Sequence, residues 1–257
     1  MESKTVKNMK LDTERMKTEL HENGRVEMQH ATNYDGYHVP MPVGNSKLGN
    51  LFRTLSLRPV VDCGNCSKCS GQCYDLRHDV RNSPAMELRC LTSAILQTDY
   101  ERFWQEVDAQ ARLSRFFRFH VGGDVPDDRY FHEMRTVAEH NPQCHFLCFT
   151  KMYDIVNRSI SMDGPLPENL HLFFSMWPGL PMDNPYNLPV TFPIFSEEDR
   201  QKYPELEAFH QQCPKFYWHC NDDCTECAIC SVNPTDENKG QGCFRLTNGD
   251  AVGFAYH

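Results

Sequence analysis

The chain has 257 residues, and its 26 Lys and Arg against 35 Asp and Glu give a formal net charge of −9. This acidic balance argues against nonspecific nucleic-acid binding, which needs clustered cationic side chains to neutralise phosphates. Hydrophobic residues make up 40% of the chain, enough for a buried core. No apolar stretch approaches the roughly 20 residues that span a bilayer, and the charged N-terminus lacks the apolar core of a secretory signal. We therefore expect a cytoplasmic protein with no membrane partner.

The chain divides into three segments by composition. Residues 1–44 carry many charges and few large apolar side chains, so we expect a solvated, partly helical extension. Residues 45–200 have globular patterning, and residues 201–257 are Cys-rich with little periodicity. We expect this last segment to fold around a metal.

Two helices are expected after residue 80. Ser83 and Pro84 have the form of an N-cap and first helical position. Thr98, with Glu101 three positions on, has the form of a capping box for the second helix.

Strands and helices then alternate. Apolar and aromatic residues predict strands at 116–121, 144–150 and 170–176, with a fourth at 189–195 that contains a proline. A helix capped by Asp127 or Asp128 follows the first of these strands, and a short helix around 153–158 follows the second. Such alternation predicts a parallel sheet with helices packed on it. Too few units are present for an eight-stranded barrel, so we expect an α/β fold with a partial parallel β/α barrel or an open sheet.

The first cysteine cluster has the spacing C-x2-C-x2-C-x3-C in a loop with Gly and Ser, the spacing of a cluster-binding loop in bacterial ferredoxins. Disulfides are rare in a reducing compartment, and four crowded thiolates repel one another without a shared cation. Because a zinc site usually takes two ligands from each of two loops, an iron–sulfur cluster, 4Fe–4S, is favoured over zinc, with buried or redox-active thiols as the alternative. The expected ligands are Cys63, Cys66, Cys69 and Cys73.

A second cluster lies near the C-terminus, where a C-x2-C-x2-C run is its firmest part. We prefer Cys213 to Cys220 as the fourth ligand, and either a second iron–sulfur cluster or a structural zinc ion fits the set. The expected ligands are Cys213, Cys224, Cys227 and Cys230. Three other cysteines lie in helix or strand patterns and are expected in the core: Cys90, Cys144 and Cys148.

Polar residues follow the expected strands at their carboxyl ends, where parallel β/α folds bind ligands. Consecutive glycines let a backbone approach a ligand closely, and an adjacent acid can receive an ammonium or hydroxyl group. The alternative is a tight turn between strand and helix. The expected cofactor-binding residues are Gly122, Gly123, Asp124 and Ser175, and the expected catalytic residues are His120, Asp124 and Lys151.

Several segments together resemble the phage gene product 88 family. They are NSKLGN (45–50), LSLRP (55–59), FFRFHVGGD (116–124), HFLCFTKMYD (145–154) and LHLFFSMWPGLP (170–181), together with the first cysteine loop, the late CxxCxxC and the final aromatic-x-His. The resemblance spans about residues 45 to 257 and omits the N-terminal extension. It indicates a phage or mobile-element origin and no particular activity.

The order of motifs is more distantly similar to that of radical S-adenosylmethionine enzymes. That resemblance implies that Cys66, Cys69 and Cys73 hold a 4Fe–4S cluster and that the turn at 122–124 holds the methionine end of S-adenosylmethionine. The C-terminal cysteines then look like an auxiliary-cluster segment. We expect such an enzyme to need an electron donor and a substrate that the sequence does not identify. The alternative is a non-catalytic, metal-stabilised binding protein in which Cys63 completes a closed site.

Overall fold

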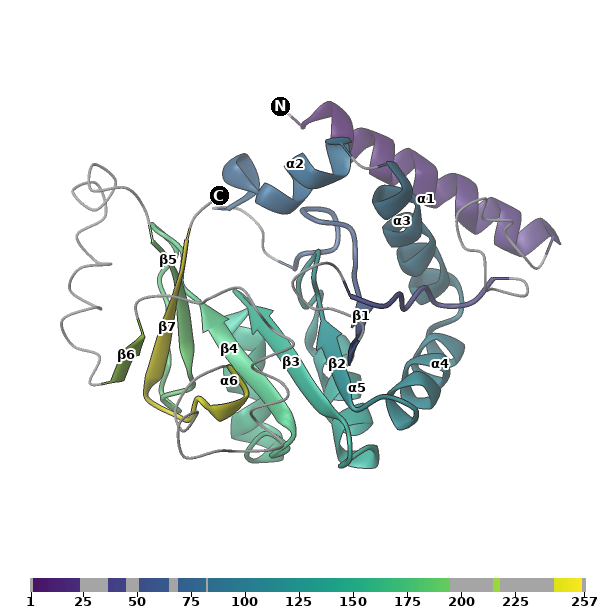
Figure 1. Cartoon of the computed structure of the whole chain (residues 1–257). Helices are drawn as coiled ribbons and strands as arrows, with labels where there is room; N and C mark the ends of the chain where they lie inside the picture. The colour runs from purple at the N-terminus through teal and green to yellow at the C-terminus, as the bar shows by residue number, and fades with distance from the viewer. Residues whose placement is uncertain are drawn as a thin grey trace.

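The computed structural model describes residues 2–23, 37–44, 51–64, 69–81, 83–194, 215–217 and 243–255. Its helices and strands follow the chain in the order shown in Figure 1. The helices are α1 (Lys4–Asn23), α2 (Tyr74–Arg81), α3 (Ser83–Thr98), α4 (Tyr100–Arg112), α5 (Asp128–His140) and α6 (Tyr153–Asp163). The strands are β1 (Phe52–Leu55), β2 (Phe116–Phe119), β3 (His145–Thr150), β4 (Leu170–Ser175), β5 (Val190–Ile194), β6 (Lys215–Tyr217) and β7 (Asp250–Ala255). Across these ranges, no helix is long and apolar enough to cross a membrane.

The strands form one sheet in the order β1-β2-β3-β4-β5-β7-β6, and every pairing between these strands is parallel. The predicted parallel α/β architecture is therefore confirmed. Strands β1 to β4 are neighbours in both sequence and space, and helices occupy each connection between them. In the described part of the chain no ladder joins the edge strands β1 and β6, so the sheet does not close into a barrel there.

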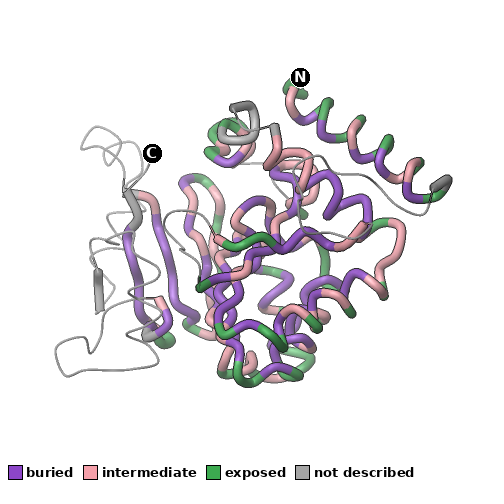
Figure 2. The backbone as a smooth tube through the Cα atoms, turned by 45° about the vertical axis from the view of Figure 1, so that its right-hand side comes forward, coloured by how far each residue is buried: buried purple, intermediate pink, exposed green. Residues whose placement is uncertain are grey.

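The two faces of the sheet have different partners because successive side chains of a strand point to opposite sides. On the helix face, Phe117, Phe119 and Phe146 belong to the main core, which also contains residues of α1, α3, α4, α5 and α6. On the other face, hereafter the inner face, Phe52 and Phe116 pack in a smaller apolar cluster with residues 244 and 246. Figure 2 shows the buried residues running along the strands. The three cysteines expected in the core are fully buried there: Cys90, Cys144 and Cys148.

Helix α1 belongs to the core, so the expectation of a solvated N-terminal extension is wrong for one side of this helix. It lies beside α3 in Figure 1, and its buried apolar residues are Val6, Met9, Met16 and Leu20. With the buried Thr13 they recur every three or four positions, which places them on one face of a helix. Because many charged residues lie between these apolar positions, the overall composition of the segment does not reveal the buried face.

The predicted cap of α5 is confirmed, and the predicted cap of α4 is wrong. Asp127 caps α5, its carboxylate accepting a hydrogen bond from the Tyr130 N–H at 2.8 Å. The capping box expected at Thr98 is wrong, because Asp99 is the N-cap of α4. The Thr98 hydroxyl instead donates back to a carbonyl within α3.

Candidate metal and cofactor site

The loops that follow β1 and β2 lie against each other at the carboxyl ends of these strands. The Leu57 N–H donates to the Gly122 carbonyl at 2.9 Å, and the Gly122 N–H donates to Ser56 Oγ at 3.2 Å. Further along the first loop, a Cβ added to Gly64 would lie only 2.9 Å from the Pro126 carbonyl oxygen. The cysteine loop and the glycine turn therefore share one rim of the sheet.

The two glycines of this turn are required by packing against the protein itself. Gly123 has a φ of +80°, and an added Cβ would lie 2.8 Å from the Leu57 Cβ. A Cβ on Gly122 would overlap the carboxylate of Asp75, which forms a buried ion pair with Arg89 at 2.8 Å. Side chains at either position would push the turn away from the loop after β1 and from α2.

Asp124 is held by hydrogen bonds to both of its carboxylate oxygens. Oδ1 accepts from Thr150 Oγ1 at 2.6 Å and from the Val125 N–H at 2.8 Å, and Oδ2 accepts from the Lys151 N–H at 2.9 Å. Burial raises the pKa of Asp124, and the Lys151 charge and these hydrogen bonds oppose the rise. The carboxylate thus joins the turn after β2 to the end of β3, which gives Asp124 a positioning role.

His120 and Ser175 also make contacts within the protein. His120 is buried, with Nε2 3.1 Å from the Tyr130 hydroxyl and Nδ1 3.9 Å from the Cys148 sulfur. Burial lowers the pKa of His120 to about 3, so the ring is neutral near pH 7. The Ser175 carbonyl accepts from the Tyr153 hydroxyl at 2.6 Å. The His120 ring contacts α5 and β3 in the core, and the Ser175 backbone helps to fix α6.

Three of the expected metal ligands lie in the described part of the first loop: Cys63, Cys69 and Cys73, all half-buried. Two of their sulfurs accept backbone hydrogen bonds, Cys63 from the Val60 N–H at 3.3 Å and Cys73 from the Leu76 N–H at 3.4 Å. The remaining expected ligands lie outside the described residues: Cys66, Cys213, Cys224, Cys227 and Cys230. Among the residues that are described, no group of three or more His, Cys, Asp or Glu is arranged to hold a metal ion.

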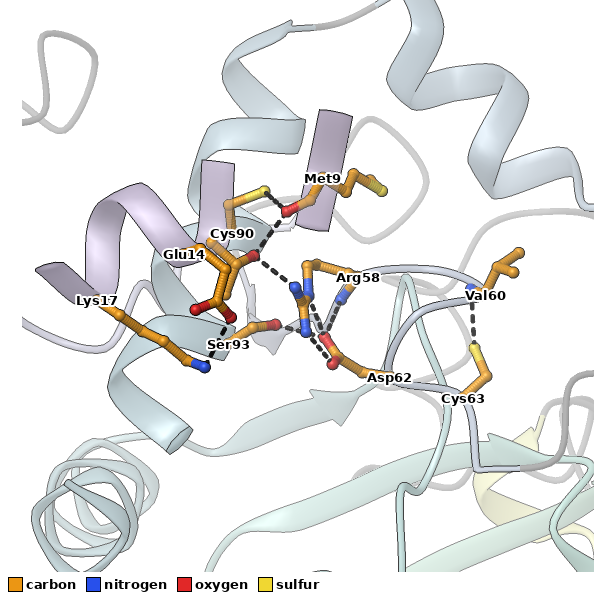
Figure 3. A network of polar contacts seen from close by, with 10 residues as sticks. Met9, Glu14, Lys17, Arg58, Val60, Asp62, Cys63, Cys90 and Ser93 are labelled. Atoms are coloured by element: carbon orange, nitrogen blue, oxygen red, sulfur yellow. Dashed lines mark hydrogen bonds and ion pairs between the residues drawn. The ribbon is translucent and has the colours of Figure 1, made fainter. Parts of the chain in front are cut away.

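A buried polar network anchors the start of the cysteine loop (Figure 3). Arg58 makes a two-point contact with Asp62, with Nε–Oδ2 at 2.8 Å and Nη2–Oδ1 at 2.5 Å. Its Nη1 also donates to Thr13 Oγ1 at 2.5 Å, and Ser93 Oγ donates to Asp62 at 2.5 Å. Helices α1 and α3 thus hold the residue that precedes Cys63. This network was not expected from the sequence, although an Arg and an Asp at spacing four in an apolar stretch were a signal for it.

Two cations near the same rim each lie over an aromatic ring. Arg118 lies over the Phe149 ring, 5.2 Å from its centroid, and Lys151 Nζ lies 5.4 Å from the Trp177 centroid. Arg118 is one residue from the carboxyl end of β2, and Lys151 directly follows β3, the neighbouring strand. Arg118 was not among the residues expected from the sequence, and its position between Phe117 and Phe119, in a strand that alternates between two faces, was the available signal.

These features define a parallel α/β protein with a cysteine loop and a glycine turn on one rim of its sheet. A family model described as Gene product 88 matches residues 5–177, about two thirds of the chain. The chain belongs to this family of phage proteins. The match includes α1, which the resemblance seen in the sequence omitted, and it ends before the C-terminal cysteines. Searches of curated proteins and of solved structures found no significant match.

Proposed function

We propose that the rim is the site of an iron–sulfur enzyme of the radical S-adenosylmethionine type, with Cys66, Cys69 and Cys73 as the cluster ligands. The observation that carries the proposal is the packing of the cysteine loop on the glycine turn, seen in the close approach of Gly64 to the Pro126 carbonyl. The order of β1 to β4 along the sheet, with helices in the connections, also supports a partial β/α barrel.

Hydrogen bonds to two sulfurs of the loop support a thiolate-bound cluster. Backbone N–H groups already point at the Cys63 and Cys73 sulfurs, and hydrogen bonds of this kind tune the potentials of iron–sulfur clusters. A bound cluster supplies one-electron chemistry, with S-adenosylmethionine as the source of the radical. An external electron donor is required.

In this proposal the chain's own residues orient the cofactor. The Asp124 carboxylate already accepts hydrogen bonds from the Thr150 hydroxyl and the Lys151 N–H. The backbone carbonyls of the turn are therefore the groups that would accept hydrogen bonds from a ligand ammonium. Asp124 fixes where those carbonyls point. Lys151, which follows β3, supplies a positive charge and an ammonium proton at the same rim.

The C-terminal cysteines form a second site in this proposal. The spacing of Cys224, Cys227 and Cys230, with Cys213 as fourth ligand, suits an auxiliary iron–sulfur cluster or a structural zinc ion. Because about 150 residues separate them from the first loop, substitution of these cysteines is expected to leave the metal of the first loop bound.

A second candidate function is a non-catalytic binding protein stabilised by a closed metal site. The specific observation in its favour is the hydrogen bond that orients the Cys63 sulfur within the same loop as Cys69 and Cys73. With Cys63 as a fourth ligand, no iron site remains for a cofactor.

The test begins with iron and acid-labile sulfide analysis of the full chain purified without oxygen. Cys69→Ala should lose both, whereas Cys144→Ala, in a core cysteine, should keep them. The reduced protein is then given S-adenosylmethionine, and methionine and 5′-deoxyadenosine are measured. Cleavage that persists in Cys63→Ala supports the enzyme. Full iron content without cleavage, and with an unchanged electron paramagnetic resonance spectrum on adding the cofactor, would establish the closed site, and absence of iron would refute both versions of the cluster.

A further inference from the structure

The inner face of the sheet is closed by aromatic packing at the amino ends of its strands. The Phe244 ring lies 5.8 Å from Phe52 and 5.4 Å from Phe116, measured between ring centroids. It also lies 5.1 Å from the His171 ring on β4. Among the described residues, the amino ends of the inner face are therefore covered, and the cysteine loop and the glycine turn lie at the carboxyl ends.

Arg118 occupies the inner face nearer to those carboxyl ends. Its neighbours Phe117 and Phe119 are fully buried on the helix face, and its guanidinium lies over Phe149. Its Nε is buried without a hydrogen-bond partner among the residues that the structure describes. Buried donors in proteins nearly always have an acceptor. The Arg118 Nε–H therefore needs an acceptor that the described chain does not supply.

Lys151 brings a second positive charge to the same place. The Asp124 carboxylate holds its backbone N–H at 2.9 Å, and its ammonium lies over Trp177. Neither Lys151 nor Arg118 makes an ion pair with an acid in the described ranges. In a chain with a net charge of −9, two cations near one rim that form no ion pair with the described acids favour the binding of an anion there.

We propose that Arg118 and Lys151 bind an oxyanion, a carboxylate or a phosphate, carried by an organic ligand at the carboxyl end of the inner face. The planar guanidinium can donate two parallel hydrogen bonds to such a group, and the ammonium adds a point charge. The aromatic rings beside the cations favour a ligand with an apolar body next to its anionic group. The anion site does not depend on the proposed function, and this ligand is the substrate only if the iron–sulfur enzyme is correct.

The test measures binding of phenyl phosphate and benzoate to the full chain by calorimetry, with benzyl alcohol as the uncharged comparison. Wild-type protein should bind one or both anions in a saturable, one-to-one manner and should not bind the alcohol. Arg118→Gln should weaken binding about 10- to 100-fold, because it removes a charge-assisted contact, and Lys151→Gln should weaken it less. The preferred anion shows whether the site suits a carboxylate or a phosphate.

Arg115→Gln is the matched control. Arg115 directly precedes β2 at its other end, and its guanidinium also lies over an aromatic ring, 6.0 Å from the Phe116 centroid. This variant removes the same charge and should bind the anions as wild type does. Arg118→Lys keeps the charge and loses the two-point contact, so it should fall between wild type and Arg118→Gln.

Three results would overturn the inference. The first is unchanged anion binding by Arg118→Gln that circular dichroism shows to be folded. The second is binding weakened as much in Arg115→Gln as in Arg118→Gln. The third is no binding of either anion by the wild-type protein. Iron and sulfide are measured on the same samples. Protein that binds the anion but contains no iron would refute the cluster and retain the anion site. Protein that contains iron and sulfide but binds no anion would refute the anion site and retain the cluster.

Discussion

Replacing Arg58 by Met tests how strongly the first cysteine loop is held. Arg58 is 4% exposed, and its contacts with Asp62 and Thr13 span 2.5–2.8 Å. Removing one partner of a buried ion pair typically costs about 3–5 kcal/mol because the other charge remains buried. Asp62 would retain the Ser93 hydroxyl and the backbone N–H of residue 58. We therefore expect the free energy of unfolding to fall by about 3 kcal/mol, the lower end of that range.

Urea unfolding followed by far-UV circular dichroism measures this loss. Arg158→Met is the control, since Arg158 makes a similar two-point contact with Asp128, at 3.0 Å for both bonds, with its side chain 52% exposed. That variant should lose less than about 1 kcal/mol. In a double-mutant cycle, Arg58→Met with Asp62→Leu should cost less than the sum of the single losses by about 1–3 kcal/mol.

Two results would refute this reasoning. Equal losses in Arg58→Met and Arg158→Met would mean that burial does not strengthen the first pair. Strict additivity in the cycle would mean that Arg58 and Asp62 are not coupled. Because Asp62 precedes Cys63, iron content should also fall in Arg58→Met if the loop holds a cluster.

Three other predictions concern the glycine turn and its neighbours. Gly123→Ala should be less stable than Gly179→Ala by about 1–3 kcal/mol. Both glycines have a positive φ, +80° and +72°, but of the two only Gly123 would place its new Cβ against a neighbour, at 2.8 Å. Equal melting temperatures of the two variants would contradict this prediction. His120, with a pKa of about 3, stays neutral in the native state while the unfolded chain takes up a proton below about pH 6.5, so lowering the pH from 7 to 5 should remove about 2 kcal/mol of stability. His120→Asn should lack this share of the pH dependence, and an identical slope in both proteins would be the contrary result. Asp124→Asn should lower the stability of cofactor-free protein by about 1.5–3 kcal/mol because an amide cannot accept at both oxygen positions; unchanged stability in thermal unfolding would contradict the positioning role.

Local patterns were enough to predict much of the fold. Runs of apolar and aromatic residues located β2, β3 and β4, and the alternation of strands with helices indicated a parallel sheet. Asp127 was a recognisable cap because its side chain acts three residues away. The first cysteine loop and the glycine turn were visible as motifs, since each lies within a few consecutive residues.

The sequence by itself thus determined the α/β class, most strand positions, and the motifs that meet at one rim. Only the tertiary structure decided what those residues touch. Asp124 accepts a hydrogen bond from a hydroxyl 26 residues away, and Arg58 donates one to a hydroxyl 45 residues away. Local sequence periodicity cannot predict contacts between residues so far apart along the chain. The burial of α1, and an Arg118 Nε that has no partner among the described residues, have the same cause. Helix and strand periodicity assigns a face to each side chain, but the packing of elements distant in sequence decides what that face contacts.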